Sequence, residues 1–144
     1  MYKRQLNDSY EPYWSQETPY DPESFRVDKE WATSKDGTKL PIYIVSRKDS
    51  PKDKPAPTVL WGYGCHGISE SPSYVSAWMP WVDKGGRYAI AIIRGGGEYG
   101  EQWHMDGSLA NKQNTFDDFI ACAERLKDVG YTSCLLYTSP SPRD

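Results

Sequence analysis

A buried strand that ends abruptly in a glycine-rich, charged turn constrains this chain more than any other feature. Residues 88–93 (YAIAII) are apolar or aromatic throughout, which predicts a strand buried on both faces of a sheet. Arg94 and three glycines follow at once. Open α/β sheets present backbone and side chains to ligands at the carboxyl edge of such strands. The run therefore predicts an α/β fold with a candidate site at this edge.

A second strand and turn of the same kind come earlier in the chain. Residues 58–61 (TVLW) predict a short buried strand, and residues 62–67 (GYGCHG) predict a sharp turn, because three of these six are glycines. Residues 71–78 predict a short helical segment that Pro80 interrupts or restarts and that residues 85–86 (Gly-Gly) end.

Residues 115–128 give the clearest helical pattern. Thr115 with Asp118 three residues later is a variant of the capping box, and Gly130 suits the position just past a helix end. The apolar residues predicted to share one face at 3.6 spacing are Phe116, Phe119, Ile120, Ala123 and Leu126. The order strand, glycine-rich turn, helix, strand, glycine-rich loop, helix is typical of the α/β class.

Residues 25–47 predict a β-hairpin. The first half alternates loosely, residues 36–37 (Asp-Gly) supply the positive φ of a tight turn, and residues 40–45 form the return strand. Pro41 predicts an edge position or a bulge for that strand. Residues 46–57 are charged and proline-containing, which indicates a solvated surface loop.

Residues 6–24 are polar and interrupted by prolines, which exclude a continuous helix or a central strand. We interpret them as an extended connector or the frayed end of a preceding domain. Aromatic residues are scattered through the stretch without a fixed period, and they are predicted to pack against sequence outside this chain, with an aromatic binding surface as the alternative: Tyr10, Tyr13, Trp14 and Tyr20.

The two ends of the chain can be encoded by one DNA sequence in opposite orientations. Tyr2–Gln5 can be written TAT AAG AGA CAG, and the reverse complement of that DNA, read from its second base, encodes Cys134–Tyr137. This inverted repeat resembles the transposase-end adapter of sequencing libraries, and the adapter continued encodes the rest of residues 134–144. We therefore expect residues 1–5 and 134–144 to be adapter-derived and exclude them from fold reasoning. A natural, disordered Ser/Pro tail is the alternative.

Composition narrows the function classes. The chain has 144 residues, a net charge of −3 and no run of Lys or Arg, which argues against a nucleic-acid partner. No apolar run approaches the roughly 18 residues of a membrane span. Three cysteines without CxxC spacing predict neither a metal site nor a disulfide framework.

The polar N-terminus resembles no signal peptide, so we expect a cytoplasmic protein, with the periplasm as the alternative. The oligomeric state is left open.

A glycine pattern raises a nucleotide-binding hypothesis. Gly95, Gly97 and Gly100 match GxGxxG after a predicted strand. In a dinucleotide site, however, the turn opens directly into a helix, whereas the next predicted helix here begins at Thr115. No acidic residue ends a second strand about 20 positions on, because residues 117–118 (Asp-Asp) fall inside that helix. A dinucleotide-binding domain is therefore the weaker alternative.

No catalytic constellation is complete. Residues 67–71 (GISES) only approach the GxSxG of a nucleophile elbow. His66 and His104 lack the spacing of metal ligands, and His104 in a loop is interpreted as a structural, hydrogen-bonding histidine.

Four further polar side chains are candidates from the residues alone. Arg94 is predicted to pair with Glu98 within its own loop, or to bind a carboxylate from elsewhere. Glu98 and Asp106 are candidate general bases for which loop-stabilising roles are preferred. The Tyr63 hydroxyl, in the middle of a glycine turn, projects from the sheet edge or packs within the turn.

From about residue 27 to residue 133 the chain resembles the catalytic domain of the prolyl oligopeptidase family of serine peptidases. The matching segments are SKDGTKLPIYIV, LWGYGCHGIS, SPSY, GGRYAIAIIRGGGEYGEQWH, LANKQNTFDDFIACAERL and GYTS. The resemblance implies a partial α/β-hydrolase domain over residues 25–133, formed by its N-terminal strands and first helices. It also implies that residues 6–24 are the exit from a preceding β-propeller.

The resemblance also implies roles for two residues. The family motif Tyr-Gly-Tyr-Gly-Gly-Phe corresponds to residues 61–66, so Tyr63 takes the place of the tyrosine that donates its hydroxyl to the oxyanion. His66 replaces a phenylalanine that lines the proline-side pocket, Cys65 replaces a glycine, and Trp61 replaces the first tyrosine. The His66 and Cys65 departures put strict post-proline specificity in doubt.

The implied activity is that of a serine oligopeptidase. Such enzymes hydrolyse short peptides through Ser-His-Asp acyl-enzyme chemistry, without metal or cofactor, and the triad follows the segment that ends at Ser133. We therefore expect the chain by itself to be inactive and its parent to act on short peptides, with cleavage after proline as one option. A non-catalytic binding relative of the same fold is the other alternative.

Overall fold

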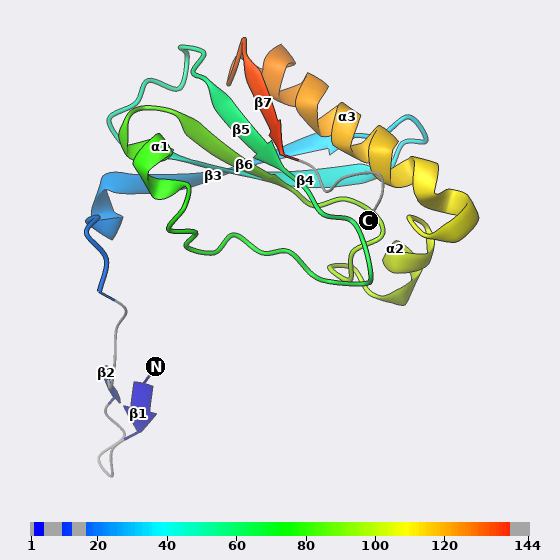
Figure 1. Ribbon diagram of the computed structural model, residues 1–144, viewed down its shortest axis with the longest axis horizontal. Coiled ribbons are helices and arrows are strands. Elements are labelled where there is room, and N and C mark those ends of the chain that lie inside the picture. The colour runs from blue at the N-terminus through cyan, green and yellow to red at the C-terminus, as the bar shows by residue number, and fades with distance from the viewer. Residues whose placement is uncertain (1, 5–9, 13–16, 139–144) are drawn as a thin grey trace.

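The computed structural model describes residues 2–4, 10–12 and 17–138. Its centre is one mixed sheet of five strands (Figure 1). The three strands β3, β4 and β6 are antiparallel neighbours, whereas β5 runs parallel to both β6 and β7. In sheet order the strands are β3 (Phe25–Thr33), β4 (Lys39–Arg47), β6 (Arg87–Ala91), β5 (Thr58–Trp61) and β7 (Leu135–Thr138). The predicted α/β class is confirmed.

The remaining elements are short, apart from one helix. The helices are α1 (Met79–Asp83), α2 (Glu101–Met105) and α3 (Lys112–Asp128), with 3₁₀ turns at Pro22–Ser24 and Leu109–Asn111. Near the N-terminus, β1 (Tyr2–Arg4) pairs with β2 (Tyr10–Pro12). In the described part of the chain, no helix has both the length and the apolar character needed to cross a bilayer. Tyr13 and Trp14 lie outside the described residues.

The predicted hairpin is confirmed, but its second strand is not an edge strand. β4 lies between β3 and β6 in continuous register, so the prediction of an edge or a bulge at Pro41 is wrong. The Pro41 carbonyl accepts a hydrogen bond from Ile92 N at 3.0 Å, which places the proline nitrogen on the same side of the strand. That side faces β6 just beyond the last pair, Ile42 with Ala91. The missing N–H therefore falls where the β4–β6 ladder ends and interrupts none of its paired residues.

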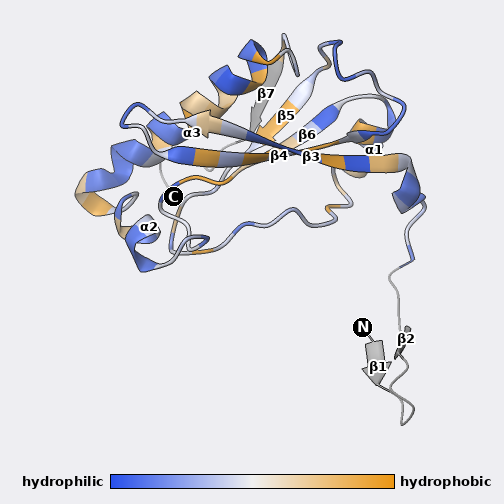
Figure 2. Cartoon of the chain, turned by 180° about the vertical axis from the view of Figure 1, so that it is seen from behind, coloured by the Kyte–Doolittle hydropathy of each residue, from blue (hydrophilic) through white to orange (hydrophobic). Residues whose placement is uncertain are grey.

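Two layers of apolar side chains cover the sheet, because successive residues of a strand face opposite sides. Ile42 and Ile44 of β4 pack in the layer that contains α3, whereas Tyr43 and Val45 pack in the layer that contains residues of α1 and of the segment before it. Figure 2 shows hydrophobic and hydrophilic residues interleaved along α3, as expected of a helix with one buried side. The α3 layer includes Leu60, Ala89, Ala91, Cys122, Ala123 and Leu126.

α3 begins three residues earlier than predicted and buries only part of the predicted face. Ala123 and Leu126 are buried and Phe119 packs against the same core, as predicted, whereas the other two apolar positions are not buried. Thr115 lies inside the helix, so the predicted capping box is wrong. Phe116 and Ile120 remain 43% and 48% exposed. The buried positions are Thr115, Asp118, Cys122, Ala123 and Leu126. The helix is rotated because the polar groups of Thr115 and Asp118 bind the loop after β6. Gly130, with φ of +79°, ends the helix as predicted.

The helix predicted at residues 71–78 is absent from the described structure. α1 begins at Met79 instead, and Pro80 occupies its first turn, where its fixed φ is favourable. The option that Pro80 restarts a helix is therefore the one the structure adopts. Residues 85–86 follow its end.

β7 lies in the stretch that the sequence assigns to an adapter. Residues 135–138 pair in parallel with β5, and Thr58 N donates to the Cys134 carbonyl at 3.2 Å. An open strand edge can pair with any short β-prone segment through backbone groups alone. The pairing of β7 with β5 is therefore compatible with either an adapter-derived or a natural origin of residues 134–144.

Leu126→Ala tests the α3 layer. Leu126 is fully buried, so its truncation is expected to lower the free energy of unfolding by about 2–5 kcal/mol. Ile120→Ala, on the exposed side of the same helix, is the control and is expected to change it by about 0.5 kcal/mol or less. Urea denaturation followed by circular dichroism measures both. Equal losses in the two variants would contradict the observed orientation of the helix.

Candidate active-site edge

Two glycine-rich segments meet where neighbouring parallel strands end. Residues 62–67, called here the Tyr63 turn, follow β5, and residues 94–100, called here the Arg94 loop, follow β6. Because β5 and β6 are parallel, their carboxyl ends lie at the same edge of the sheet. This is the edge at which α/β proteins place their sites, as the sequence predicts.

Backbone groups of the two segments are in direct contact. Gly67 N donates to the Gly95 carbonyl at 3.1 Å, and Gly97 N donates to the Ile68 carbonyl at 3.3 Å. A side chain at Gly64, where φ is +59°, would lie 2.8 Å from the Arg94 carbonyl oxygen. A side chain at Gly95 would overlap the Gly64 carbonyl. These glycines therefore allow two backbones to pack closely.

The same contacts bear on the GxGxxG pattern. A short helix, α2, does follow Gly100 directly, so the expectation that the next helix begins at Thr115 is wrong. However, protein backbone occupies the space beside Gly95 and Gly97. Contact with the Tyr63 turn thus explains Gly95 and Gly97, and Gly100 precedes α2 with a φ of +88°, so the pattern needs no nucleotide.

Arg94 joins three separate parts of the chain through a buried guanidinium. Its Nε and Nη2 donate to the two oxygens of Asp118 in α3, at 2.8 and 2.6 Å. Its Nη1 donates to Asp36 in the β3–β4 turn at 2.5 Å, and Nη2 also reaches Ser34 at 3.4 Å. The predicted pair with Glu98 is wrong, because the guanidinium is paired with Asp118 and Asp36 instead.

The electrostatics of this cluster follow from burial and pairing. The Arg94 side chain is 5% exposed and the Asp118 side chain is fully buried. Asp118 also accepts the backbone N–H of Arg94 at 3.1 Å, so one carboxylate holds both the side chain and the main chain. The hydrogen bond to Asp118 raises the pKa of Arg94 above its ordinary value. The hydrogen bond from Arg94 lowers the pKa of Asp36 from 3.8 to about 2.

Residues after the Arg94 loop hold its backbone from the other side. The Trp103 indole N–H donates to the Ile93 carbonyl at 3.1 Å, and Gly95 N donates to the Trp103 carbonyl at 3.1 Å. His104 Nδ1 lies 2.7 Å from the Gly95 carbonyl, which can only accept, so Nδ1 carries the proton. His104 is therefore a structural, hydrogen-bonding histidine, as predicted.

Glu98 and Asp106 also stabilise loops. Glu98 Oε1 accepts the backbone N–H of Glu70 at 2.8 Å, and burial raises the pKa of Glu98. The Asp106 side chain accepts from Gln102 at 2.7 Å, while its carbonyl accepts from Asn114 at 2.8 Å. Both contacts match the loop-stabilising role preferred from the sequence.

Tyr63 and His66 lie on the same turn and face a common surface. Their ring centroids are 6.4 Å apart at an interplanar angle of 41°. Tyr63 is half-buried, whereas His66 is exposed and adopts a φ of +54°. None of the hydrogen bonds among the described residues uses the Tyr63 hydroxyl, so it can donate to a group outside the turn.

Sequence reasoning missed Lys112 as a support of this turn. Its ammonium donates to the Gly64 carbonyl at 2.7 Å, from the first position of α3. Lys112 lines a shallow depression of about 530 Å³ beside Cys65, His66 and His104. Lys112 lies in the segment LANKQN, which resembles the family, and this resemblance was the sequence signal that could have pointed to it. Within the described residues, no cluster of His, Cys, Asp or Glu is suited to hold a metal ion.

Comparisons with known proteins agree with this geometry. A family model described as the prolyl oligopeptidase family matches residues 72–134. The prolyl endopeptidase of Elizabethkingia miricola is 42% identical over 123 residues, which are 85% of this chain and 17% of that protein.

Two solved structures share the fold closely. A prolyl endopeptidase, from a study of two such enzymes and their inter-domain dynamics, matches with a TM-score of 0.88 at 42% identity, covering 96% of this chain and 21% of that one. Oligopeptidase B from Trypanosoma brucei with covalently bound antipain, in a closed form, matches with a TM-score of 0.86 at 39% identity, covering 93% and 20%. This chain therefore spans about a fifth of the length of these relatives.

The matched part of those enzymes is an α/β-hydrolase catalytic domain, of which this chain forms a partial sheet with its first helices. The predicted relation to one family, the prolyl oligopeptidases, is confirmed by the family model, the relatives and the solved structures together.

Asp118→Asn tests the buried ion pair. Removing the negative charge leaves the Arg94 cation buried beside a neutral amide, so we expect the free energy of unfolding to fall by about 3 kcal/mol or more. Asp117→Asn is the matched control, because Asp117 forms an ion pair with the exposed Lys35 and is expected to contribute about 1 kcal/mol or less. Chemical denaturation measures both. Equal losses of the free energy of unfolding in the two variants would contradict a structural role for the Arg94–Asp118 pair.

The Asp36 contact predicts a pH dependence of stability. A folded-state pKa of about 2, below the ordinary 3.8, stabilises the fold at pH values above about 4. This stabilisation is lost as the pH falls from about 4 toward 2. The free-energy difference between the wild type and Asp36→Asn should therefore shrink across that range, in denaturation curves recorded at each pH. Asp53→Asn, in the exposed 46–57 loop, is the control, and an unchanged difference for Asp36→Asn would contradict the contact.

Proposed function

We propose that the protein from which this chain comes is a serine peptidase that hydrolyses short peptides through an acyl-enzyme. The observation that carries the proposal is the Tyr63 turn, held rigidly at the carboxyl edge of β5 by the Arg94 loop and by Lys112. The names of the matched relatives, which are prolyl endopeptidases and oligopeptidase B, support peptide hydrolysis as the reaction class.

Tyr63 is proposed as a donor to the oxyanion. When a nucleophile attacks a peptide carbonyl, the oxygen becomes negatively charged, and a fixed donor aimed at it stabilises the transition state more than the ground state. A phenol O–H on a turn that is supported from two sides satisfies this requirement, because its position is fixed before the reaction begins. The companion donor would be the backbone N–H after the nucleophilic serine.

His66 is proposed as a substrate-binding residue. Its exposed imidazole lies beside Tyr63 and replaces the family's phenylalanine. An imidazole is polar and offers a hydrogen bond, so the pocket for the residue before the cleaved bond would be less apolar than a proline pocket. We therefore propose a specificity broader than post-proline cleavage, with short peptides as the substrate class.

The triad chemistry belongs to the sequence expected after Ser133. A serine Oγ would attack the carbonyl carbon and pass its proton to a histidine, which an aspartate orients; the histidine would then protonate the leaving amine. Residues 6–24 are proposed to lead out of a preceding β-propeller, and residues 1–5 and 134–144 to derive from an adapter. The cytoplasm, or alternatively the periplasm, is the proposed compartment.

A catalytically inactive binding relative is the rival of the same fold. The codons that follow Ser133 in the source gene distinguish the two, because an enzyme requires GxSxG there. Sequencing that gene is the first experiment, since it also decides the origin of the two ends.

Tyr63→Phe in the full-length protein tests the oxyanion role. Loss of one oxyanion donor is expected to lower kcat about 10²- to 10³-fold with little change in KM. Tyr99→Phe, an exposed tyrosine of the Arg94 loop, is the matched control and should leave kcat unchanged. Steady-state hydrolysis of a fluorogenic peptide amide measures both. An unchanged kcat in Tyr63→Phe would show that Tyr63 does not donate to the oxyanion.

A further inference from the structure

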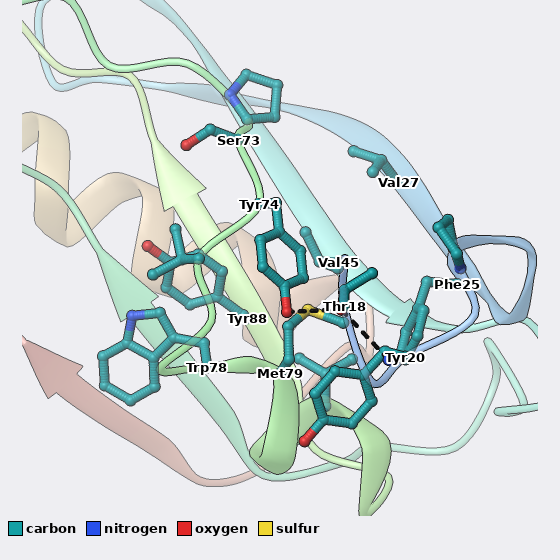
Figure 3. A pocket seen from close by; sticks show the side chains of 14 residues that line it. Thr18, Tyr20, Phe25, Val27, Val45, Ser73, Tyr74, Trp78, Met79 and Tyr88 are labelled. Carbon is teal, nitrogen blue, oxygen red and sulfur yellow. Dashed lines mark hydrogen bonds between the residues drawn. The ribbon is translucent and has the colours of Figure 1, made fainter. Parts of the chain in front are cut away.

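A second pocket lies on the α1 side of the sheet and shares no residue with the Tyr63 turn or the Arg94 loop (Figure 3). Its lining comes from the end of the connector at residues 18–22, from the strands β3, β4 and β6, and from residues 72–82 with the start of α1. Its volume is about 220 Å³. None of its fourteen lining residues is charged, which makes a charged ligand unfavourable.

Aromatic rings form two of the walls. Tyr20 meets Phe25 edge to face, with centroids 6.2 Å apart at 79°. Trp78 stacks on Tyr88 with centroids 5.5 Å apart at 18°. Rings in a pocket favour another ring, because offset and edge-to-face contacts add to the burial of apolar area. The aliphatic part of the lining consists of Val27, Val45, Val75, Met79 and Val82.

The mouth of the pocket carries one polar group with hydrogen-bonding capacity to spare. The Thr18 and Tyr74 hydroxyls lie 2.8 Å apart, and Tyr20 N donates to Thr18 Oγ1 at 3.2 Å (Figure 3). Whichever hydroxyl donates in the Thr18–Tyr74 bond, the hydrogen of the other remains free. That free hydrogen can donate to an oxygen on a ligand seated in the pocket.

We propose that this pocket binds a small neutral aromatic molecule that carries one hydroxyl-type oxygen, of the size of p-cresol. The size follows from the volume, because an apolar cavity of about 150 Å³ already accepts benzene and this one is larger. The ring follows from the aromatic walls, and the single oxygen from the hydroxyl pair at the mouth. The site is independent of the proposed peptidase reaction and is present in the chain itself.

Methyl NMR on the 144-residue chain tests the proposal, with p-cresol as the probe and toluene as its apolar counterpart. We expect saturable shifts of the valine and methionine methyl groups that line the pocket, with a Kd on the order of 1 mM. The double variant Thr18→Val/Tyr74→Phe, which removes both hydroxyls, should weaken p-cresol about threefold or more and leave toluene binding unchanged, since only p-cresol uses the hydroxyl pair.

A filling variant locates the site. Val27 lines the pocket from the exposed edge strand β3, where tryptophan is well tolerated, so Val27→Trp should weaken both ligands about tenfold or more. Thr33→Trp, at the far end of the same strand and outside the pocket, is the control and should bind as the wild type does. If Val27→Trp does not fold, as judged by circular dichroism, Val75→Phe replaces it.

Several results would overturn the proposal. They are the absence of saturable shifts in the lining methyl groups, equal binding by the filled variant and the control, or shifts that centre on residues outside the pocket. Unchanged p-cresol binding in Thr18→Val/Tyr74→Phe, or an equal loss of toluene and p-cresol binding, would refute the role of the hydroxyl pair and with it the proposed ligand class.

Discussion

The ion pair between Arg94 and Asp118 is the contact on which the site edge depends. Asp118 binds both the guanidinium and the backbone N–H of Arg94, while Asp36 binds the far side of the same guanidinium. One buried cation thereby ties the end of β6 to the middle of α3 and to the β3–β4 turn. Buried ion pairs often add little net stability over apolar residues of the same volume, because both charges lose their hydration. We infer that this pair is retained for position, since each partner accepts only one arrangement of the three segments.

The Arg94–Asp118 ion pair supports the Tyr63 turn indirectly, through backbone contacts of the Arg94 loop. The Arg94 carbonyl accepts from the Thr115 hydroxyl at 2.8 Å, and Gly95 and Gly97 then contact the Tyr63 turn directly. Lys112 of the same helix holds the Gly64 carbonyl. The turn thus rests on both α3 and the Arg94 loop. Support of this backbone limits the positions open to the Tyr63 side chain, which the proposed oxyanion role would require for electrostatic preorganisation.

The sequence predicts the elements better than their contacts. The strands at residues 58–61 and 88–93 and the hairpin turn at residues 36–37 are read from local rules, such as apolar runs and Asp-Gly turns, and these predictions hold. The errors at Arg94 and Thr115 have one cause: their partners lie 24 and 21 residues away, and no local pattern encodes such a pairing. The apolar face predicted for α3 is correct for Phe119, Ala123 and Leu126 and wrong for the two other positions, because polar contacts set the rotation of the helix. The role of Tyr63 came only from family resemblance.

The contacts described above that fix the site edge lie between Ser34 and Asp118. Support of the Tyr63 turn and the chemistry of catalysis can therefore depend on different parts of the chain. Support of the Tyr63 turn requires only the elements described above, so the oxyanion donor would be in place before the rest of a catalytic domain packs against it. The proposed catalysis, by contrast, also requires a nucleophile and its partners, which the family resemblance implies follow Ser133. The exposed apolar residues of α3, Phe116 and Ile120, mark a surface that a larger domain would cover. The contacts that position the Tyr63 turn are therefore contained in a short stretch of chain. The groups that would break the peptide bond are separate from these contacts.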